Sequence, residues 1–325
     1  MTIHRRNLIG FGAASIATSL LPHQASAQTA FPTGPIRILL PTPAGGGNDA
    51  ICRFMGERMT EQWKQPVVVD NRSGAAGIIA TQALVRSPAD GHTIMYTNSN
   101  VLSSLVVHSA PGYRLSDLAP VSWVCDIPIA IGVTRTLGVN SLKELVALAR
   151  ARPGKLSYAS PGAGGSPNFV GELLKGETGT AIVHIPYRGD APAVQAVVAG
   201  EVEIVIGTVG LMARYPDKIK ILAAAGEKRF PSAPDVPTLR EEGYPAVDMP
   251  GWGGFFAPAG TPAPIVQRLA GEIERLLKLP ELSRRMIDFG FLPLGYGPEK
   301  FAPMMTDHLE RFRKVVAQGR IQVTQ

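Results

Sequence analysis

Two glycine-rich stretches hold residues suited to binding an anion. The first reads PAGGGND over residues 43–49, and the second reads SPGAGGSPN over residues 160–168. Glycine adopts positive φ angles and lets a ligand approach bare backbone, so that amide groups can donate to anionic oxygens. Each stretch lies between an apolar run and a helical segment, whose first-turn amides add further donors. Either stretch alone could be an ordinary tight turn, but the two together predict a polar cleft.

The spacing of these glycines argues against nucleotides. A phosphate loop needs G-x-x-x-x-G-K-[ST], and no lysine follows the glycines of either stretch. The dinucleotide pattern G-x-G-x-x-G also fails, because Gly162-Ala163-Gly164 continues as Gly165-Ser166-Pro167. A small carboxylate needs only backbone donors, a few hydroxyls and one cation, for which Arg188 is the best candidate. Arg72 has a structural alternative, which is pairing with Asp70.

No catalytic, metal or cofactor signature appears in the sequence. The nucleophile pattern G-x-S-x-G, the metal pattern H-E-x-x-H and the pair C-x-x-C are all absent. His184 lies within a predicted strand, where a histidine satisfied inside the sheet is the simpler interpretation. Ser160 or Ser166 acting with His184 as an exported serine hydrolase is a remote alternative. We therefore expect a binding protein and no enzyme, with no metal and no cofactor.

Apolar runs alternate with helical segments along the chain, which indicates an α/β fold with parallel sheets covered on both faces. The predicted strands are 36–40, 67–70, 93–97, 121–125, 128–133, 156–159, 182–186, 202–206 and 219–224. The predicted helices are 48–63, 75–86, 101–107, 141–150, 167–177, 190–199, 236–242, 262–278, 281–289 and 298–317. The glycine-rich loops follow the carboxyl ends of strands, the edge where open α/β sheets bind ligands.

Composition predicts two lobes. Seams occur near 126–135 and in the proline- and glycine-rich stretch 230–264. We expect residues 28–129 plus 251–325 to form the first lobe and residues 130–250 the second. The chain would then cross twice between the lobes, which makes a hinge.

Residues 1–27 have the pattern of an export signal. Arg5 and Arg6 precede the apolar run 8–21, and small residues end at Ala27. The run is shorter than the roughly 20 residues of a membrane span, and the pattern favours an export signal over the alternative of a buried N-terminal helix. The paired arginines leave Sec and twin-arginine export both open. Either route predicts the periplasm.

Charge and cysteine content narrow the function further. The net charge of +6 falls to +4 without residues 1–27, which hold two arginines and no acid. Basic and acidic residues alternate along the chain with no basic block, which argues against nucleic acid. Cys52 and Cys125 are too few for a disulfide scaffold or a zinc site. Two separate buried thiols are the simpler expectation, although an exported protein could join them.

The mature chain resembles the Bug/TctC family, the extracytoplasmic solute-binding receptors of tripartite tricarboxylate transporters. The resemblance lies in FPTGPIRILLPTPAGGGND, VVVDNRSGAAGIIATQALVRSPADGHTIMY, LSYASPGAGGSPNFVGELLK, IVHIPYRGDAPAVQAVVAGEVEI, FPSAPDVPTLREEGYP and WGGFFAPAGTPAPIVQRLAGEIERLL, in that order. It implies a two-lobed periplasmic-binding-protein (Venus flytrap) fold with crossing hinge strands that closes on a small carboxylate or dicarboxylate. The implied partners are the permease subunits of such a transporter or, alternatively, a periplasmic sensor kinase. A monomer is expected.

The resemblance also implies which residues bind the ligand, with one carboxylate held by backbone amides and ordered waters. They are Pro43, Ala44, Gly45, Gly46, Asn48, Asp49, Thr97, Asn98, Ser99, Ser160, Gly162, Gly164, Gly165, Ser166, Asn168, Tyr187, Arg188 and Gly189. Two positions depart from the family: Asn168 stands where histidine is frequent, and Gln195 where aspartate is frequent. The identity of the ligand is left open.

Overall fold

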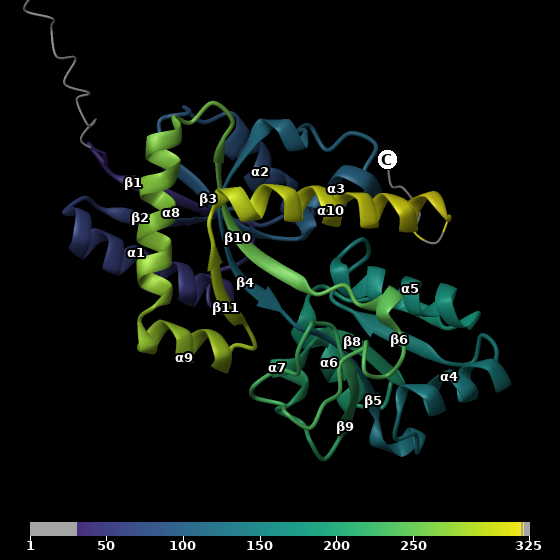
Figure 1. Cartoon of the computed structure of the whole chain (residues 1–325). Coiled ribbons are helices and arrows are strands. Elements are labelled where there is room, and N and C mark those ends of the chain that lie inside the picture. Colours follow the sequence, from purple (N-terminus) through teal and green to yellow (C-terminus); the bar gives the residue numbers. More distant parts are fainter. Residues whose placement is uncertain (1–30, 320, 322–325) are drawn as a thin grey trace, which may run out of the picture. The chain divides into compact units, whose positions relative to one another are not determined.

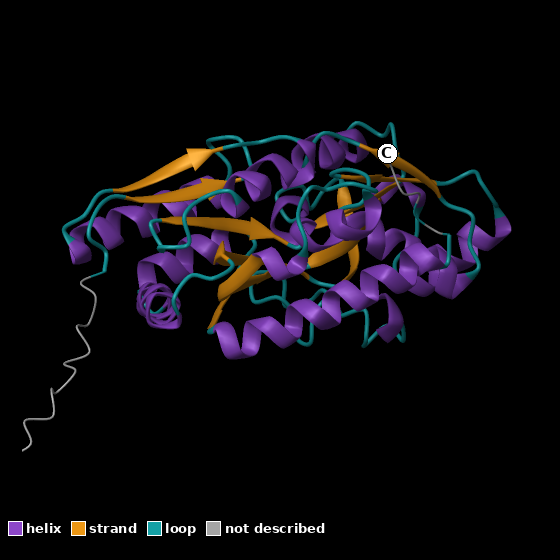
Figure 2. Cartoon of the chain, turned by 90° about the horizontal axis from the view of Figure 1, so that it is seen from above, coloured by secondary structure: helices purple, strands orange, loops and turns teal. Residues whose placement is uncertain are grey.

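The strands of this chain form two mixed sheets, with helices packed against them (Figures 1 and 2). The computed structural model describes residues 31–319 and 321, and Pro32–Gln325 belong to one unit. The predicted signal peptide, residues 1–27, lies outside the described residues. The α/β class is confirmed, but the sheets are mixed rather than purely parallel.

The first sheet has six strands in the order β11-β4-β10-β3-β1-β2. Its strands are β1 (Ile36–Leu40), β2 (Val67–Asn71), β3 (Thr93–Asn98), β4 (Leu118–Ile127), β10 (Gly251–Pro258) and β11 (Leu292–Tyr296). β1 pairs in parallel with β2 and β3, whereas β10 runs antiparallel to β3 and β4, and β11 antiparallel to β4.

The second sheet has five strands in the order β7-β6-β8-β5-β9. Its strands are β5 (Ile129–Thr134), β6 (Ser157–Ser160), β7 (Val183–Pro186), β8 (Ile204–Thr208) and β9 (Ile219–Ala224). β6 pairs in parallel with β7 and β8, and β5 runs antiparallel to β8 and β9.

Each sheet contains the same βαβαβ unit, which explains the pairing of the two glycine loops. In the first sheet the helices are α1 (Gly47–Trp63) and α2 (Ile78–Val85), and in the second they are α5 (Ser166–Thr178) and α6 (Asp190–Val198). The three parallel strands lie in the order β2-β1-β3 in one sheet and β7-β6-β8 in the other. The carboxyl ends of parallel strands meet at one edge, so each unit gathers its loops there.

The other helices extend these units. They are α3 (Asn100–Val107), α4 (Leu142–Ala151), α7 (Val209–Met212), α8 (Ala263–Leu277), α9 (Pro280–Asp288) and α10 (Pro298–Ala317), with the 3₁₀ turns η1 (Ala75–Gly77), η2 (Leu115–Asp117), η3 (Arg135–Leu137) and η4 (Pro245–Val247). α10 packs against both α3 and α5 (Figure 1). The rings of Phe169 and Phe312, from α5 and α10, lie 4.4 Å apart, so one apolar core continues from the first sheet to the second.

The chain passes twice between the sheets. It leaves the first sheet at Ile127, enters the second at Ile129, and returns between Ala224 and Gly251. The helix predicted over 236–242 is wrong: the reciprocal bonds between Thr238 and Glu241 cap only a turn, and Gly243, at φ 88°, follows it. The strands β10 and β11 and the short α7 were not predicted.

Candidate functional site

The first glycine loop turns sharply from β1 into α1. Gly45 has φ 90°, which favours glycine, and Gly46 is extended and occupies the N-cap position. The amide of Gly45 donates to Asp49 Oδ2 at 3.0 Å. Ala50 N donates to Gly46 O at 3.0 Å, which starts the helix. The amides of Gly46 and Gly47 donate to no acceptor within the described part of the chain.

Asp49 is buried and fully engaged by the protein. Arg53 Nε donates to its Oδ2 at 2.9 Å, and Asn71 Nδ2 donates to its Oδ1 at 3.0 Å. These donors, led by Arg53, hold the pKa of Asp49 down at about 2. A position so close to the start of a helix predicts that Asp49 caps it, but this prediction is wrong: Gly46 is the N-cap residue, and Asp49 lies in the first turn and holds the loop through its hydrogen bonds.

The second glycine loop repeats this conformation between β6 and α5. Gly164 has φ 72°, Gly165 is the extended N-cap residue, and the Gly164 amide donates to Asn168 Oδ1 at 2.9 Å. Phe169 N donates to Gly165 O at 3.1 Å. Asn168 therefore does in the second sheet what Asp49 does in the first.

A buried polar network supports the second loop. Asn168 Nδ2 donates to Tyr158 Oη at 2.8 Å, and Tyr158 Oη donates to Glu172 Oε1 at 2.8 Å. Lys175 forms an ion pair with Glu172, and the ring of His184 stacks on that of Tyr158 at 4.7 Å. Every member has a partner, so the network fixes the loop rigidly.

Ser160 and His184 are brought together as the hydrolase alternative would require. His184 Nε2 lies 2.7 Å from Ser160 Oγ. Ser160 Oγ donates to Gly162 O at 3.1 Å, however, which leaves His184 Nε2–H to donate to Ser160 and His184 Nδ1 to accept from Asn168 at 3.3 Å. Burial lowers the pKa of His184 to about 4, and Ser160 is fully buried. In this geometry Ser160 and His184 hold the second glycine loop in place through their hydrogen bonds.

The loops of the two sheets meet at the start of α3. Ser99 Oγ, after β3, lies 2.6 Å from Ser166 Oγ in the first turn of α5, and both residues are buried. A Cβ on Gly164 would lie 3.0 Å from Val107, so close packing also requires glycine there. The predicted residues Ser99, Gly164 and Ser166 are thus neighbours.

The remaining predicted residues lie around these loops. Asn98 Oδ1 accepts from Asn100 N at 3.0 Å, which shapes the turn after β3. In the second sheet Tyr187 N donates to Ser160 O at 2.8 Å, and Gly189 N donates to Pro161 O at 3.1 Å. Arg188 between them is exposed and forms no ion pair or hydrogen bond with the described residues. It is available as a ligand cation.

The structure adds a loop outside the predicted ligand set. After β2, Gly74, Ala75, Ala76 and Gly77 all have positive φ angles. For the two alanines this conformation is strained, and such strain gathers at functional sites. A Cβ on Gly77 would lie 3.3 Å from Pro41, so this loop adjoins the first glycine loop. The glycines that follow the strand were the signal in the sequence.

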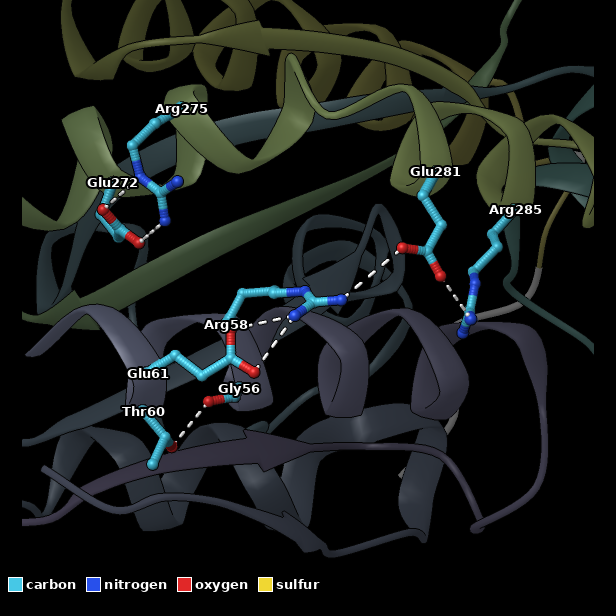
Figure 3. Close-up of polar contacts among 8 residues, drawn as sticks. All are labelled: Gly56, Arg58, Thr60, Glu61, Glu272, Arg275, Glu281 and Arg285. Carbon is cyan, nitrogen blue, oxygen red and sulfur yellow. Dashed lines mark hydrogen bonds and ion pairs between the residues drawn. The ribbon is translucent and has the colours of Figure 1, made fainter. Parts of the chain in front are cut away.

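A separate hollow of about 450 Å³ lies among α1, α8 and α9. It is lined by Arg58, Glu61, Gln62, Arg275, Leu279, Pro280 and Glu281. Figure 3 shows that its arginines are already paired: Arg58 with Glu61 and Glu281, and Arg275 with Glu272. Because these arginines already pair with carboxylates, the hollow has fewer free donors for an anion than the glycine loops have.

Three further findings concern the cysteines, the helices and possible metal ligands. Cys52 and Cys125 are both buried and unpaired, as the simpler expectation held. Among the helices of residues 31–319, none is long and apolar enough to cross a membrane. Within the described residues, no three His, Cys, Asp or Glu side chains gather closely enough to hold a metal ion.

The sequence of this chain is similar to those of a family of receptors. The model of the tripartite tricarboxylate transporter family receptor, TctC, matches residues 51–320. A UPF0065 protein of the tcbD-tcbE intergenic region of Pseudomonas sp. (strain P51) is 33% identical over 99% of this chain and 96% of its own. The protein BugT of Bordetella pertussis (strain Tohama I) is 32% identical over 93% of this chain and 94% of its own.

Solved structures show the same fold. The periplasmic binding protein BugD superposes with a TM-score of 0.77 at 28% identity and covers 90% of this chain and 99% of its own. An R. palustris protein solved with adipate has a TM-score of 0.80 at 29% identity, with coverage of 90% and 99%. MatC from Rhodopseudomonas palustris, with bound malate, has a TM-score of 0.76 at 27% identity, with coverage of 88% and 100%. The fold is that of periplasmic binding proteins.

Proposed function

The chain belongs to the tripartite tricarboxylate transporter family of receptors, and from that premise we propose that it captures a small carboxylate or dicarboxylate in the periplasm. The observation that carries this proposal is the contact between Ser99 Oγ, which follows β3 of the first sheet, and Ser166 Oγ of the second glycine loop, because it brings strand-end loops of the two sheets together. Each glycine loop keeps free first-turn amides, and the two together can surround an anion. The adipate and malate found in two related structures belong to the same ligand class.

The proposal has a definite architecture. Residues 28–129 plus 251–325 form one lobe, residues 130–250 form the other, and the crossings near 128 and 225–250 act as the hinge. The ligand contacts residues 43–49, 97–99, 160–168 and 187–189. The loaded monomer then delivers the acid to the membrane subunits of a tripartite tricarboxylate transporter. Export through the signal in residues 1–27 places it in the periplasm.

Thermal unfolding tests the binding step directly. Ligand-stripped protein is screened against linear dicarboxylates, hydroxy acids, amino acids and aromatic acids, each at 1 mM. An acid present at about a hundredfold excess over its Kd stabilises the protein by about 2.7 kcal/mol, which raises the Tm by several degrees. The absence of a shift across the whole panel would contradict the proposal.

The same preparation distinguishes binding from hydrolysis. The wild-type chain and His184→Ala are incubated with ester and amide substrates of the acids that bind. We expect no turnover by either protein, because Ser160 is buried and its proton is directed to Gly162 O. Turnover that disappears in His184→Ala would replace the receptor proposal with the hydrolase.

A further inference from the structure

The two glycine loops have the same backbone but different charges, and we propose that they receive different ends of the ligand. The loop of residues 160–168, with Arg188, takes the carboxylate. The loop of residues 43–49 takes an uncharged end that donates a hydrogen bond, such as an amide or a hydroxyl. This inference rests on the proposed function and narrows the ligand to acids with two unlike ends.

The two glycine loops have the same hydrogen-bonding pattern at equivalent positions. Gly45 and Gly164 are the left-handed residues, and their amides donate at 3.0 Å and 2.9 Å to the side chain four residues later. That side chain is the Asp49 carboxylate in one loop and the Asn168 amide in the other. The first-turn amides of α1 therefore have an ionised carboxylate beside them, whereas those of α5 have a neutral group.

The cations of the first loop are already neutralised. Arg53 pairs with Asp49 at 2.9 Å, and Arg72, which follows β2, pairs with Asp70 at 2.9 Å. Beside the second loop, Arg188 follows β7 and has no carboxylate partner among the described residues. Of these three arginines, Arg188 beside the second loop therefore offers a ligand carboxylate an unpaired guanidinium, whereas Arg53 and Arg72 do not.

The first loop also has an acceptor without a donor. Asn48 Oδ1, in the first turn of α1, is buried and receives no hydrogen bond from the described chain. A buried acceptor gains most from a donor supplied by the ligand. A second carboxylate has no proton to supply at neutral pH, whereas an amide or hydroxyl does. The charge of Asp49 and the free acceptor of Asn48 thus favour the same kind of ligand end.

Matched ligand series test this assignment. Calorimetry at pH 7.5 compares dicarboxylates of three to six carbons with the half-amides of the same chain lengths, on ligand-stripped protein. We expect the best half-amide to bind at least tenfold more tightly than its dicarboxylate. A dicarboxylate that binds equally or more tightly overturns the inference and leaves the proposed function standing. If no member of the screening panel and neither series binds, both fail.

A pair of arginine variants locates the carboxylate. Arg188→Gln should weaken the best-binding half-amide at least tenfold, because it removes the unpaired cation. Arg72→Gln is the matched control, since Arg72 also follows a strand of the repeated unit but is paired with Asp70; its affinity should stay within threefold of wild type. Circular dichroism verifies folding of both. A Kd of Arg188→Gln within threefold of wild type overturns the assignment.

Discussion

At the scale of residues, the glycines of the first loop serve different purposes. Gly45 is required by its backbone, because φ 90° strains any side chain that replaces it. Gly46 has an ordinary extended backbone at φ −84°, and a Cβ there would meet nothing within 4 Å. Gly46 therefore leaves its amide accessible to a ligand. A substitution there tests ligand binding without the backbone strain that a substitution at Gly45 would add.

We predict that Gly46→Leu lowers carboxylate affinity at least a hundredfold while leaving the Tm within about 2 °C of wild type. The side chain enters open space beside the helix's free amides without backbone strain. Calorimetry and thermal unfolding measure the two effects. Gly271→Leu, also in open space but on α8, is the control and should bind normally. Unchanged affinity in Gly46→Leu would mean that this loop is only a turn.

Ala75 and Ala76 lie in the left-handed region at φ 45° and 51°. We predict that Ala76→Gly raises the free energy of unfolding by up to about 1 kcal/mol, because relief of strain exceeds the added entropy of the unfolded chain. Ala76→Val should lower it by about 1–2 kcal/mol, since a branched side chain fits this region worst. Urea titration measures both. The reverse order of stability would show that the loop is unstrained.

At the scale of elements, the predicted strands correspond closely to those observed, because buried β-branched runs are a strong local signal. The strand β10 escaped prediction because GWGGFF reads as a glycine-rich loop. Its glycines are instead demanded by neighbours: a Cβ on Gly253 would lie 2.0 Å from Tyr96 Oη, and one on Gly254 2.7 Å from Phe301. Such a requirement arises from contacts distant in sequence and cannot be derived from local pattern.

Some features of the candidate site could also be predicted from local sequence, and others could not. The glycine loops were predictable, since Gly, Ser and Asn after a strand have local meaning. The partners of Asp49 and Asn168 were not, because Asn71, Tyr158 and His184 are brought to them by strand pairing. The sequence therefore predicts where a ligand can approach, while the fold decides which groups are left free to meet it.

The end of β4, where the chain crosses to the second sheet, contains a carboxyl group with an unusual pKa. Trp123 Nε1 donates to Asp126 Oδ1 at 2.9 Å. Burial, helped by the nearby Glu227 and Asp248, raises the pKa of Asp126 to about 6. The folded state therefore binds a proton between about pH 4 and 6 where the unfolded state does not, and stability falls as pH rises through that range.

We predict that Asp126→Asn raises the free energy of unfolding by about 2 kcal/mol at pH 7.5 and leaves it nearly unchanged at pH 4. The asparagine still accepts from Trp123 but never ionises. Urea unfolding at the two pH values measures the difference. Asp217→Asn, at an exposed position, is the control and should change the free energy of unfolding by less than about 0.5 kcal/mol. Equal gains at both pH values would point to packing instead.

At the scale of the whole molecule, two crossings, one apolar core and the Ser99–Ser166 contact link the sheets. The repeated βαβαβ unit gives each sheet one glycine loop with free first-turn amides. In the proposed site the ligand contacts both loops, so its binding energy comes from both sheets at once.

We predict that a bound carboxylate slows amide hydrogen exchange in both loops together. The amides of residues 46–48 and 165–166, which lack protein acceptors among the described residues, should gain at least tenfold protection at saturating ligand. Peptides from α4, whose Arg150 contacts the opposite, C-terminal end of α5 at Thr178, provide the internal control and should exchange at an unchanged rate. Mass spectrometry of the free and loaded protein measures the effect. Protection confined to the loop of one sheet would contradict a two-sided site, because a ligand held between the sheets must order both loops.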